Sequence, residues 1–190
     1  GIYFSSCDNP SSMRGELYNN MIGNFAGTPT YYGIYNYSSD YWNVYHNTVD
    51  IQVSSTSTVR GCYFTSVNYF DIRNNIFSVV GTSSTSNHYA YYNTSSPSTT
   101  RVLDYNVYYN PNGTYLIYSG GSRTASVLNT YSTAGDVNSI NKMAPFSSTS
   151  DLHLTDACFD KVSALTAVTT DIDGDMRNPV FPHPGADEVG

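Results

Sequence analysis

The sequence predicts an all-β protein whose chain winds as a parallel β-helix, a solenoid of about four to six coils. Two sequence features that recur in phase about every 28 residues carry this prediction. The composition supports it, because 15% of the 190 residues are aromatic and only 12% are charged, which is typical of sheets and turns more than of helices. A propeller blade would need about 40 residues, whereas about 28 suit a coil of three short strands.

The first recurring feature is an asparagine that interrupts an apolar segment. The segments are LYNNMI at 17–22, VYHNTV at 44–49, IRNNIF at 72–77 and LDYNVY at 103–108. Asparagine is depleted in strands, yet it tolerates the left-handed backbone of a sharp corner. Stacked amides can also hydrogen-bond from coil to coil. We therefore expect a structural ladder at a corner between two strands, formed by Asn20, Asn47, Asn75 and Asn106.

The second feature is a short tyrosine-containing segment: GIYF at 1–4, GIYN at 33–36, GCYF at 61–64 and YAYY at 89–92. Side chains alternate between the two faces of a strand, which predicts one inward and one outward column. The expected inward positions here are Ile2, Ile34, Cys62 and Ala90, and those before the asparagines are Leu17, Val44, Ile72 and Leu103. The expected outward positions are Tyr3, Tyr35, Tyr63 and Tyr91.

The charge balance excludes some partners. The net charge is −7 with only eight basic residues, whereas a nucleic-acid groove needs clustered Lys and Arg. No apolar run of about 18 residues occurs, so we expect no membrane span. Scarce Lys with abundant Ser, Thr, Asn and Tyr favours a secreted or cell-surface protein. Because the sequence opens directly at Gly1, we expect it to be part of a longer protein with flanking domains.

The repeat fades after about residue 120, and a different series of motifs follows: DVNSI at 136–140, APF at 144–146, DLHL at 151–154, ACFD at 157–160, TDIDGDMR at 170–177 and GADE at 185–188. In this order the motifs resemble those that close secreted right-handed parallel β-helix repeat proteins of the Bacteroidetes type, whose coils also carry paired asparagines. A longer, proline-rich segment at 178–184 departs from that pattern.

The resemblance implies a right-handed winding, with residues 1–120 forming coils. Residues 121–190 would form the last coil or coils and an irregular C-terminal capping region of the same domain. We expect this region to cover the end of the solenoid. Asp187 and Glu188 would then lie on a charged edge strand.

Catalytic candidates are few. Glycoside hydrolases need paired carboxylates, and lyases need a base with cations that neutralise a carboxylate. His46, Arg73 and Asp104 fall in the same or neighbouring columns of successive coils and are the best local set. The alternative is structural, with Arg73 and Asp104 forming an exposed ion pair and His46 beside the ladder.

The tyrosine column suggests binding. An outward row of Tyr3, Tyr35, Tyr63 and Tyr91 could stack on a sugar chain, or the rings could stack on one another to cover the surface.

A metal site is not expected. Asp171, Asp173 and Asp175 outline a calcium-like loop, but Gly174 comes too early for an EF-hand and position twelve is Pro182. A turn whose aspartates bond the backbone and pair with Arg177 explains the segment as well. The histidines show no ligand-like spacing, so no zinc site is predicted. Calcium is the one cofactor left open.

These observations favour a non-catalytic β-helix module of a larger secreted or cell-surface protein. It would serve adhesion or act as a structural stalk, with a polysaccharide or cell-surface glycan as its partner. The alternative is the C-terminal part of a polysaccharide lyase or glycoside hydrolase that acts on an extracellular polysaccharide. Ice binding is disfavoured, because the threonines fall in irregular stretches.

Overall fold

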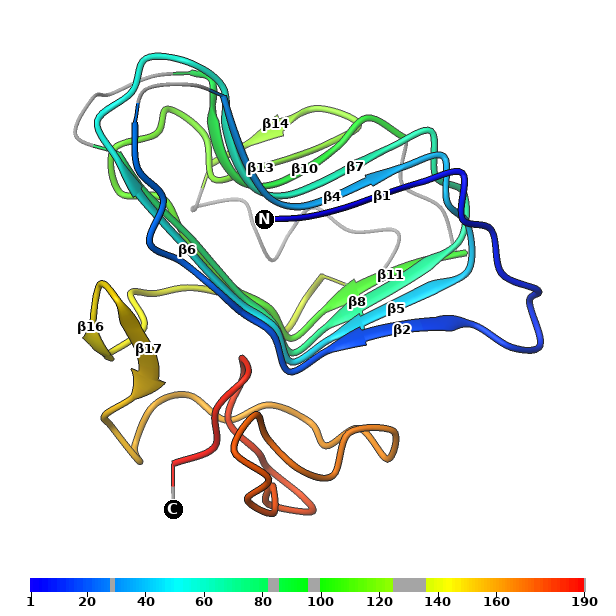
Figure 1. The fold of residues 1–190 in the computed structure, drawn as a ribbon, viewed down its shortest axis with the longest axis vertical. Coiled ribbons are helices and arrows are strands. Elements are labelled where there is room, and N and C mark those ends of the chain that lie inside the picture. The colour runs from blue at the N-terminus through cyan, green and yellow to red at the C-terminus, as the bar shows by residue number, and fades with distance from the viewer. Residues whose placement is uncertain (28–29, 82–85, 96–99, 125–135, 190) are drawn as a thin grey trace.

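The computed structural model describes residues 1–27, 30–81, 86–95, 100–124 and 136–189. Within these ranges the chain forms strands and no helix, and Figure 1 shows the strands winding around a common interior. The fold is a parallel β-helix of about four turns, as the repeat predicted. No helix of the described part is long and apolar enough to cross a membrane. Residues 125–135, within the expected capping region, lie outside the described residues.

Each of the first four coils contributes one strand to each of three sheets. Sheet A contains β1 (Ile2–Ser5), β4 (Tyr31–Tyr37), β7 (Val59–Thr65), β10 (His88–Asn93), β13 (Ile117–Ser119) and the antiparallel β14 (Ser122–Arg123). Sheet B contains β2 (Gly15–Tyr18), β5 (Trp42–Tyr45), β8 (Phe70–Arg73) and β11 (Arg101–Asp104). Sheet C contains β3 (Met21–Ile22), β6 (Thr48–Val53), β9 (Ile76–Gly81), β12 (Val107–Tyr109) and β15 (Ile140–Asn141). A hairpin of β16 (Phe146–Ser148) and β17 (Asp151–Leu154) lies outside the coils.

The parallel register places the same column of each coil against the next. In sheet B, Leu17 pairs with Val44, Val44 with Ile72 and Ile72 with Leu103. These side chains form the interior together with the inward column of sheet A. The ladder asparagines lie at the corner that follows sheet B in each coil. The inward column of sheet B is therefore placed as the sequence predicted.

The fourth coil corrects one prediction. Tyr91 is fully buried and pairs with Cys62, whereas Tyr92 pairs with Tyr63 on the outside. The predicted column positions were thus one residue too early in this coil. Ala90 is also buried, but the inward position beside Cys62, which the sequence analysis gave to Ala90, is occupied by Tyr91.

The corner between sheets B and C uses the residue before each ladder asparagine. That residue has a positive φ in four coils, at Asn19 (54°), His46 (50°), Asn74 (61°) and Tyr105 (56°). Asparagine adopts this backbone more readily than most residues, which explains the paired asparagines of 19–20 and 74–75. The first of each pair turns the chain, and the second forms the ladder.

Sheet C contributes side chains to two cores. Its inward side chains join the main core, while Ile76 and Val107 point outward into a second core with Ala144, Leu154 and Phe159. The rest of the outer face is mixed, because β6 alternates apolar and polar residues and β9 adds Ser78. The covering side chains come from the C-terminal segment, residues 144–189.

The C-terminal segment therefore lies along the side of the coils, where Figure 1 shows it in orange and red below β6 and β2. It bonds three successive coils: Asn19 Nδ2 donates to Thr170 O (2.7 Å), Ala186 N to Thr48 Oγ1 (2.9 Å) and Gly185 N to Asn74 O (2.8 Å). The expected cap over the end of the solenoid was therefore wrong, because the C-terminal segment covers a side of the coils. The expected charged edge strand was also wrong, because Asp187 is buried and neither it nor Glu188 lies in a strand.

Candidate functional site

The ladder asparagines form one continuous file of hydrogen bonds. Asn20 Nδ2 donates to Asn47 Oδ1 (2.8 Å), Asn47 Nδ2 to Asn75 Oδ1 (3.0 Å) and Asn75 Nδ2 to Asn106 Oδ1 (2.9 Å). Each acceptor oxygen also takes the backbone N–H of the preceding rung. Ser139 continues the file, since its Oγ accepts from Asn106 N (2.8 Å). The file is saturated with internal bonds, so it serves the fold and not a ligand.

His46 is not available for catalysis in this structure. Its ring is fully buried beneath the C-terminal segment, with Nδ1 3.3 Å from Gly185 O and Nε2 3.0 Å from Asn74 Nδ2. Burial, reinforced by the charge of Arg177, lowers the pKa of His46 to about 3. A neutral imidazole with both nitrogens engaged inside the protein can neither reach nor deprotonate a substrate.

Arg73 and Asp104 adjoin in register but do not pair. Arg73 donates from Nε and Nη2 to the carboxylate of Asp71 on its own strand (2.7 and 2.6 Å), and Tyr45 Oη donates to the same carboxylate (2.8 Å). Burial, followed by the charge of Asp71, raises the pKa of Tyr45 to about 12. Asp104 instead accepts from Asn138 N (2.9 Å) and Nδ2 (2.8 Å). The structure thus separates the three candidate catalytic residues, and the expected Arg73–Asp104 pair is replaced by Arg73–Asp71.

The outward tyrosines of sheet A pack ring against ring: two pairs are stacked (Tyr35–Tyr63 and Tyr92–Tyr118), Tyr3–Tyr35 is tilted and Tyr63–Tyr92 is edge-to-face. Ring centroids are 4.9 Å apart for Tyr3–Tyr35, 4.6 Å for Tyr35–Tyr63, 5.5 Å for Tyr63–Tyr92 and 4.4 Å for Tyr92–Tyr118. The planes of Tyr35 and Tyr63 are 9° from parallel, and the Arg60 guanidinium lies 4.1 Å from the Tyr63 centroid. Arg60 and neighbouring rings thus lie against the faces of Tyr63 and Tyr92 on which a sugar would stack, while Tyr3 remains 63% exposed. This geometry favours structural stacking, with Tyr92 in place of the expected Tyr91.

The acidic loop at 171–175 is organised by Asp171. Its Oδ1 accepts the backbone N–H of Asp173 and of Asp175 (2.9 Å each), and its Oδ2 accepts that of Glu188 (3.1 Å). Asp171 therefore holds a turn and has little capacity left for calcium. Asp173 turns to a different neighbour, His153, whose Nε2 lies 2.9 Å from Asp173 Oδ2. Within the described residues, His153, Asp173 and Asp187 are the set whose side-chain donor atoms could hold a metal, since these atoms lie within 4.8 Å of one another.

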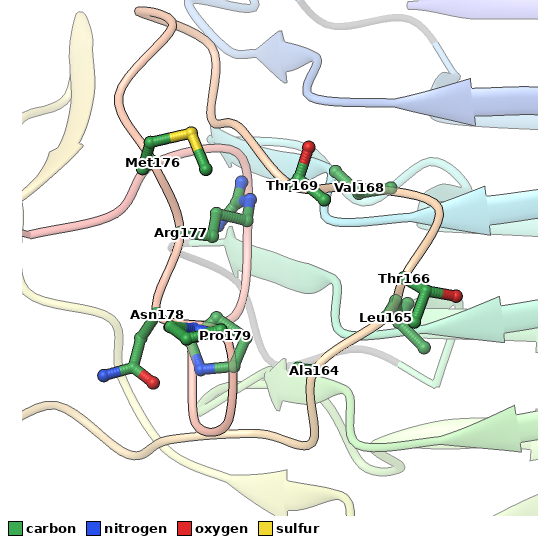
Figure 2. Close-up of a pocket in the computed structure, with 10 residues that line it drawn as sticks. Ala164, Leu165, Thr166, Val168, Thr169, Met176, Arg177, Asn178 and Pro179 are labelled. Carbon is green, nitrogen blue, oxygen red and sulfur yellow. The ribbon is translucent and has the colours of Figure 1, made fainter.

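A small apolar cavity of about 210 Å³ lies inside the C-terminal segment. Figure 2 shows it between the stretch that carries Leu165, Val168 and Thr169 and the stretch that carries Met176 and Arg177. Arg177 is almost fully buried, and its Nη2 already donates to Asn19 Oδ1 (3.0 Å) and Gly185 O (2.9 Å). The cavity therefore has no free polar group of this residue to orient a ligand.

A larger opening lies between β16 and the outer face of sheet C. Two adjoining cavities of about 350 Å³ and about 260 Å³ share the lining residues Asp50, Gln52 and Thr149. We call them together the Asp50 groove. It is lined by Asn24, Phe25, Asp50, Gln52, Ser78, Val80, Tyr109, Met143, Ala144, Pro145, Phe146, Ser148 and Thr149.

The floor of the Asp50 groove follows the solenoid axis. Asp50 pairs in register with Ser78, and Ser78 with Tyr109, so one outward column of sheet C contributes from three successive coils. Asn24 and Phe25 add the first coil. With coils about 4.8 Å apart, the floor spans about 14 Å, which is long enough for an extended, chain-like ligand.

Asp50 is the ionisable centre of the groove. It is 2% exposed, and its Oδ2 accepts from Gln52 Nε2 (2.7 Å). Burial raises the pKa of Asp50, while hydrogen bonding from Ser78 and Gln52 opposes the shift. A buried carboxyl with a perturbed pKa inside a cleft marks a candidate binding site. Sequence reasoning missed the site. Its one signal was an acidic residue at an outward position within the strand TVDIQV.

No protein-family model, curated protein or solved structure matches the chain. The resemblance to secreted β-helix repeat proteins therefore remains a prediction.

Proposed function

We propose that this chain is a non-catalytic β-helix module of a larger secreted or cell-surface protein, which binds a neutral glycan chain in the Asp50 groove for adhesion or as part of a structural stalk. The observation that carries the proposal is a groove on a rigid sheet whose polar side chains come from successive coils. A repeating floor matches a repeating ligand, because each coil can meet one unit of a chain.

The chemistry of the lining supports a polyhydroxylated ligand. Asp50 and the amide of Gln52 can accept hydroxyl protons, and Ser78 and Ser148 can both donate and accept. Tyr109 adds an aromatic ring to this polar lining, and such mixed linings orient small ligands in many sites. The groove also lacks basic side chains among its described lining residues, which disfavours an acidic polysaccharide.

The same lining argues against hydrolysis. Hydrolases place two carboxyl groups on either side of the scissile bond, about 5 to 9.5 Å apart. Asp50 is the one carboxylate among the described residues that line the groove. A lyase would need a base together with cationic neutralisation of the substrate, and the lining provides no Lys, Arg or His.

The proposal is tested with a glycan array, followed by titration of the best neutral oligosaccharide. Asp50→Asn should weaken binding about 10- to 100-fold, because a hydrogen bond to a charged group contributes about 1.5–3 kcal/mol. Glu16→Gln is the matched control, since Glu16 is an exposed acid on β2, outside the groove, and it should bind like the parent.

Equal binding by the parent and Asp50→Asn would refute the groove as the site. New reducing ends, or absorbance from an unsaturated product, would instead support the lyase or hydrolase alternative. Loss of signal in a Tyr35→Ala variant with Asp50→Asn unaffected would return the site to the tyrosines of sheet A.

A further inference from the structure

Three side chains from separate parts of the C-terminal segment converge beside the β16–β17 hairpin. His153 lies on β17, Asp173 in the acidic loop and Asp187 near the end of the described chain, and their donor atoms lie within 4.8 Å of one another. An imidazole nitrogen with two carboxylates is a common donor set for divalent transition metals. The spacing in sequence, 20 and then 14 residues, gave no motif.

The geometry is close to that of a bound ion. His153 Nε2 lies 2.9 Å from Asp173 Oδ2. Two ligand atoms of a tetrahedral zinc ion lie about 3.3 Å apart, because each bond to the metal is about 2.0–2.1 Å. A shift of a few tenths of an ångström would therefore admit an ion in place of the bridging proton, which would leave to solvent. Asp151 Oδ1 lies 2.5 Å from His153 Nδ1, the position of the carboxylate that orients many metal-binding histidines.

Asp187 adds a mostly buried acid to the cluster. The residue is 7% exposed, and its Oδ2 accepts from Leu154 N (2.7 Å). Burial disfavours the charged carboxylate and raises the pKa of Asp187, and a cation bound beside it would offset that cost. The other oxygen of Asp187, Oδ1, can bind a metal ion. His153 and Asp173 can bind the same ion from the solvent side, where their side chains are about half exposed (43% and 54%).

We propose that His153, Asp173 and Asp187 form a binding site for a divalent transition-metal ion such as Zn²⁺, with water completing the coordination. The ion would join β17 to the acidic loop and to the end of the chain. Because β17 pairs with β16, and Phe146 and Ser148 of β16 line the Asp50 groove, the metal would hold one wall of the groove. The site itself does not depend on the proposed function, whereas its effect on the groove does.

The test starts from the full chain after treatment with a chelator and dialysis. Titration calorimetry with Zn²⁺ should show one site per chain, and Zn²⁺ should raise the melting temperature. His153→Gln and Asp173→Asn should each weaken the Zn²⁺ affinity at least tenfold. Both side chains are exposed, so these variants should fold. Asp175→Asn is the matched control, because Asp175 is an exposed acid of the same loop outside the cluster, and it should bind Zn²⁺ like the parent.

No saturable Zn²⁺ binding by the parent, or equal binding by the parent, His153→Gln and Asp173→Asn, would overturn the proposal. Ca²⁺ should leave the melting temperature unchanged, because an imidazole is a poor ligand for this ion; a larger shift with Ca²⁺ than with Zn²⁺ would also overturn it. Glycan titration with and without Zn²⁺ is read separately. A metal site without glycan binding would refute the proposed function alone.

Discussion

The outer faces of sheets A and C belong to the same solenoid, yet they meet different surroundings. Sheet A carries outward tyrosines whose rings pack against one another along the axis, with Tyr3 63% exposed. On sheet C the outward Ile76 and Val107 are buried beneath the C-terminal segment, while the outward Asp50 and Ser78 line the groove beside it. The repeat of the coils therefore determines which side chains point inward, while the outward side chains of a sheet determine whether another segment packs on that sheet.

The difference explains where a binding groove can form. A covered sheet has a boundary at which the cover ends, and the Asp50 groove lies at that boundary on sheet C. In the part of the chain that the structure describes, the second core lies against sheet C and not against sheet A, whose outward rings pack against one another instead. The contrast predicts that substitutions on the covered face of sheet C cost more stability than substitutions on the exposed face of sheet A.

Ile76→Ala should have the largest effect. Ile76 is fully buried in the second core with Val107, Leu154 and Phe159, and such truncations cost about 2–5 kcal/mol. The free energy of unfolding, measured in denaturant, should fall by about 3 kcal/mol. Val80→Ala, on the same strand but half-buried at the groove, should cost clearly less. Equal costs would mean that the C-terminal segment contributes little to the stability of sheet C.

His46→Asn should remove a large part of the acid sensitivity. The pKa of His46 is about 3 in the folded protein, against an ordinary value of 6.5. Below pH 6.5 His46 therefore becomes protonated in the unfolded chain but stays neutral in the folded protein. This contribution lowers the free energy of unfolding by about 1.4 kcal/mol per pH unit down to about pH 3, or about 2 kcal/mol at pH 5.

Asparagine suits this position, because Asn19 and Asn74 hold the same column with positive φ in the adjacent coils. Denaturant midpoints measured from pH 7.5 to 4 should decline less steeply in His46→Asn than in the parent. Parallel declines would show that His46 is reached by solvent when the C-terminal segment opens locally.

Tyr63→Leu should have the smallest effect. It removes the stacking on Tyr35 and the contact with Arg60, and such contacts contribute about 1 kcal/mol beyond buried area. Thermal unfolding should shift by only a few degrees. A loss as large as that of Ile76→Ala would abolish the distinction between the two outer faces.

The periodic part of this fold was predictable, and the rest was not. The ladder and the inward column of sheet B follow from the 27- and 28-residue steps, because stacking forces equal positions into contact. Tyr91 was misplaced because the fourth coil offers tyrosine at three of the four positions from 89 to 92, so residue type could not fix the register.

The Asp50 groove and the His153 cluster were missed for a different reason. Asp50 meets Phe146 and Thr149, and His153 meets Asp173 and Asp187, only because the C-terminal segment folds back along the side of the coils. No periodicity connects these residues. The expectation of an end cap placed the segment on the wrong surface, and the apolar residues Ile76 and Val107 at outward positions of sheet C were the available sign of its true place.

The amide file has a sense of direction. From Asn20 to Asn75, each Nδ2 donates to the Oδ1 of the next coil, so these amide-to-amide bonds all run in one direction along the axis. Asn47 Nδ2 and Asn75 Nδ2 also donate to Leu17 O and Val44 O of the preceding coil. Each bond polarises the next, and the file strengthens as it lengthens. Interrupting it at Asn75 would leave two short, weakly polarised pieces, whereas losing Asn20 would only shorten it by one member.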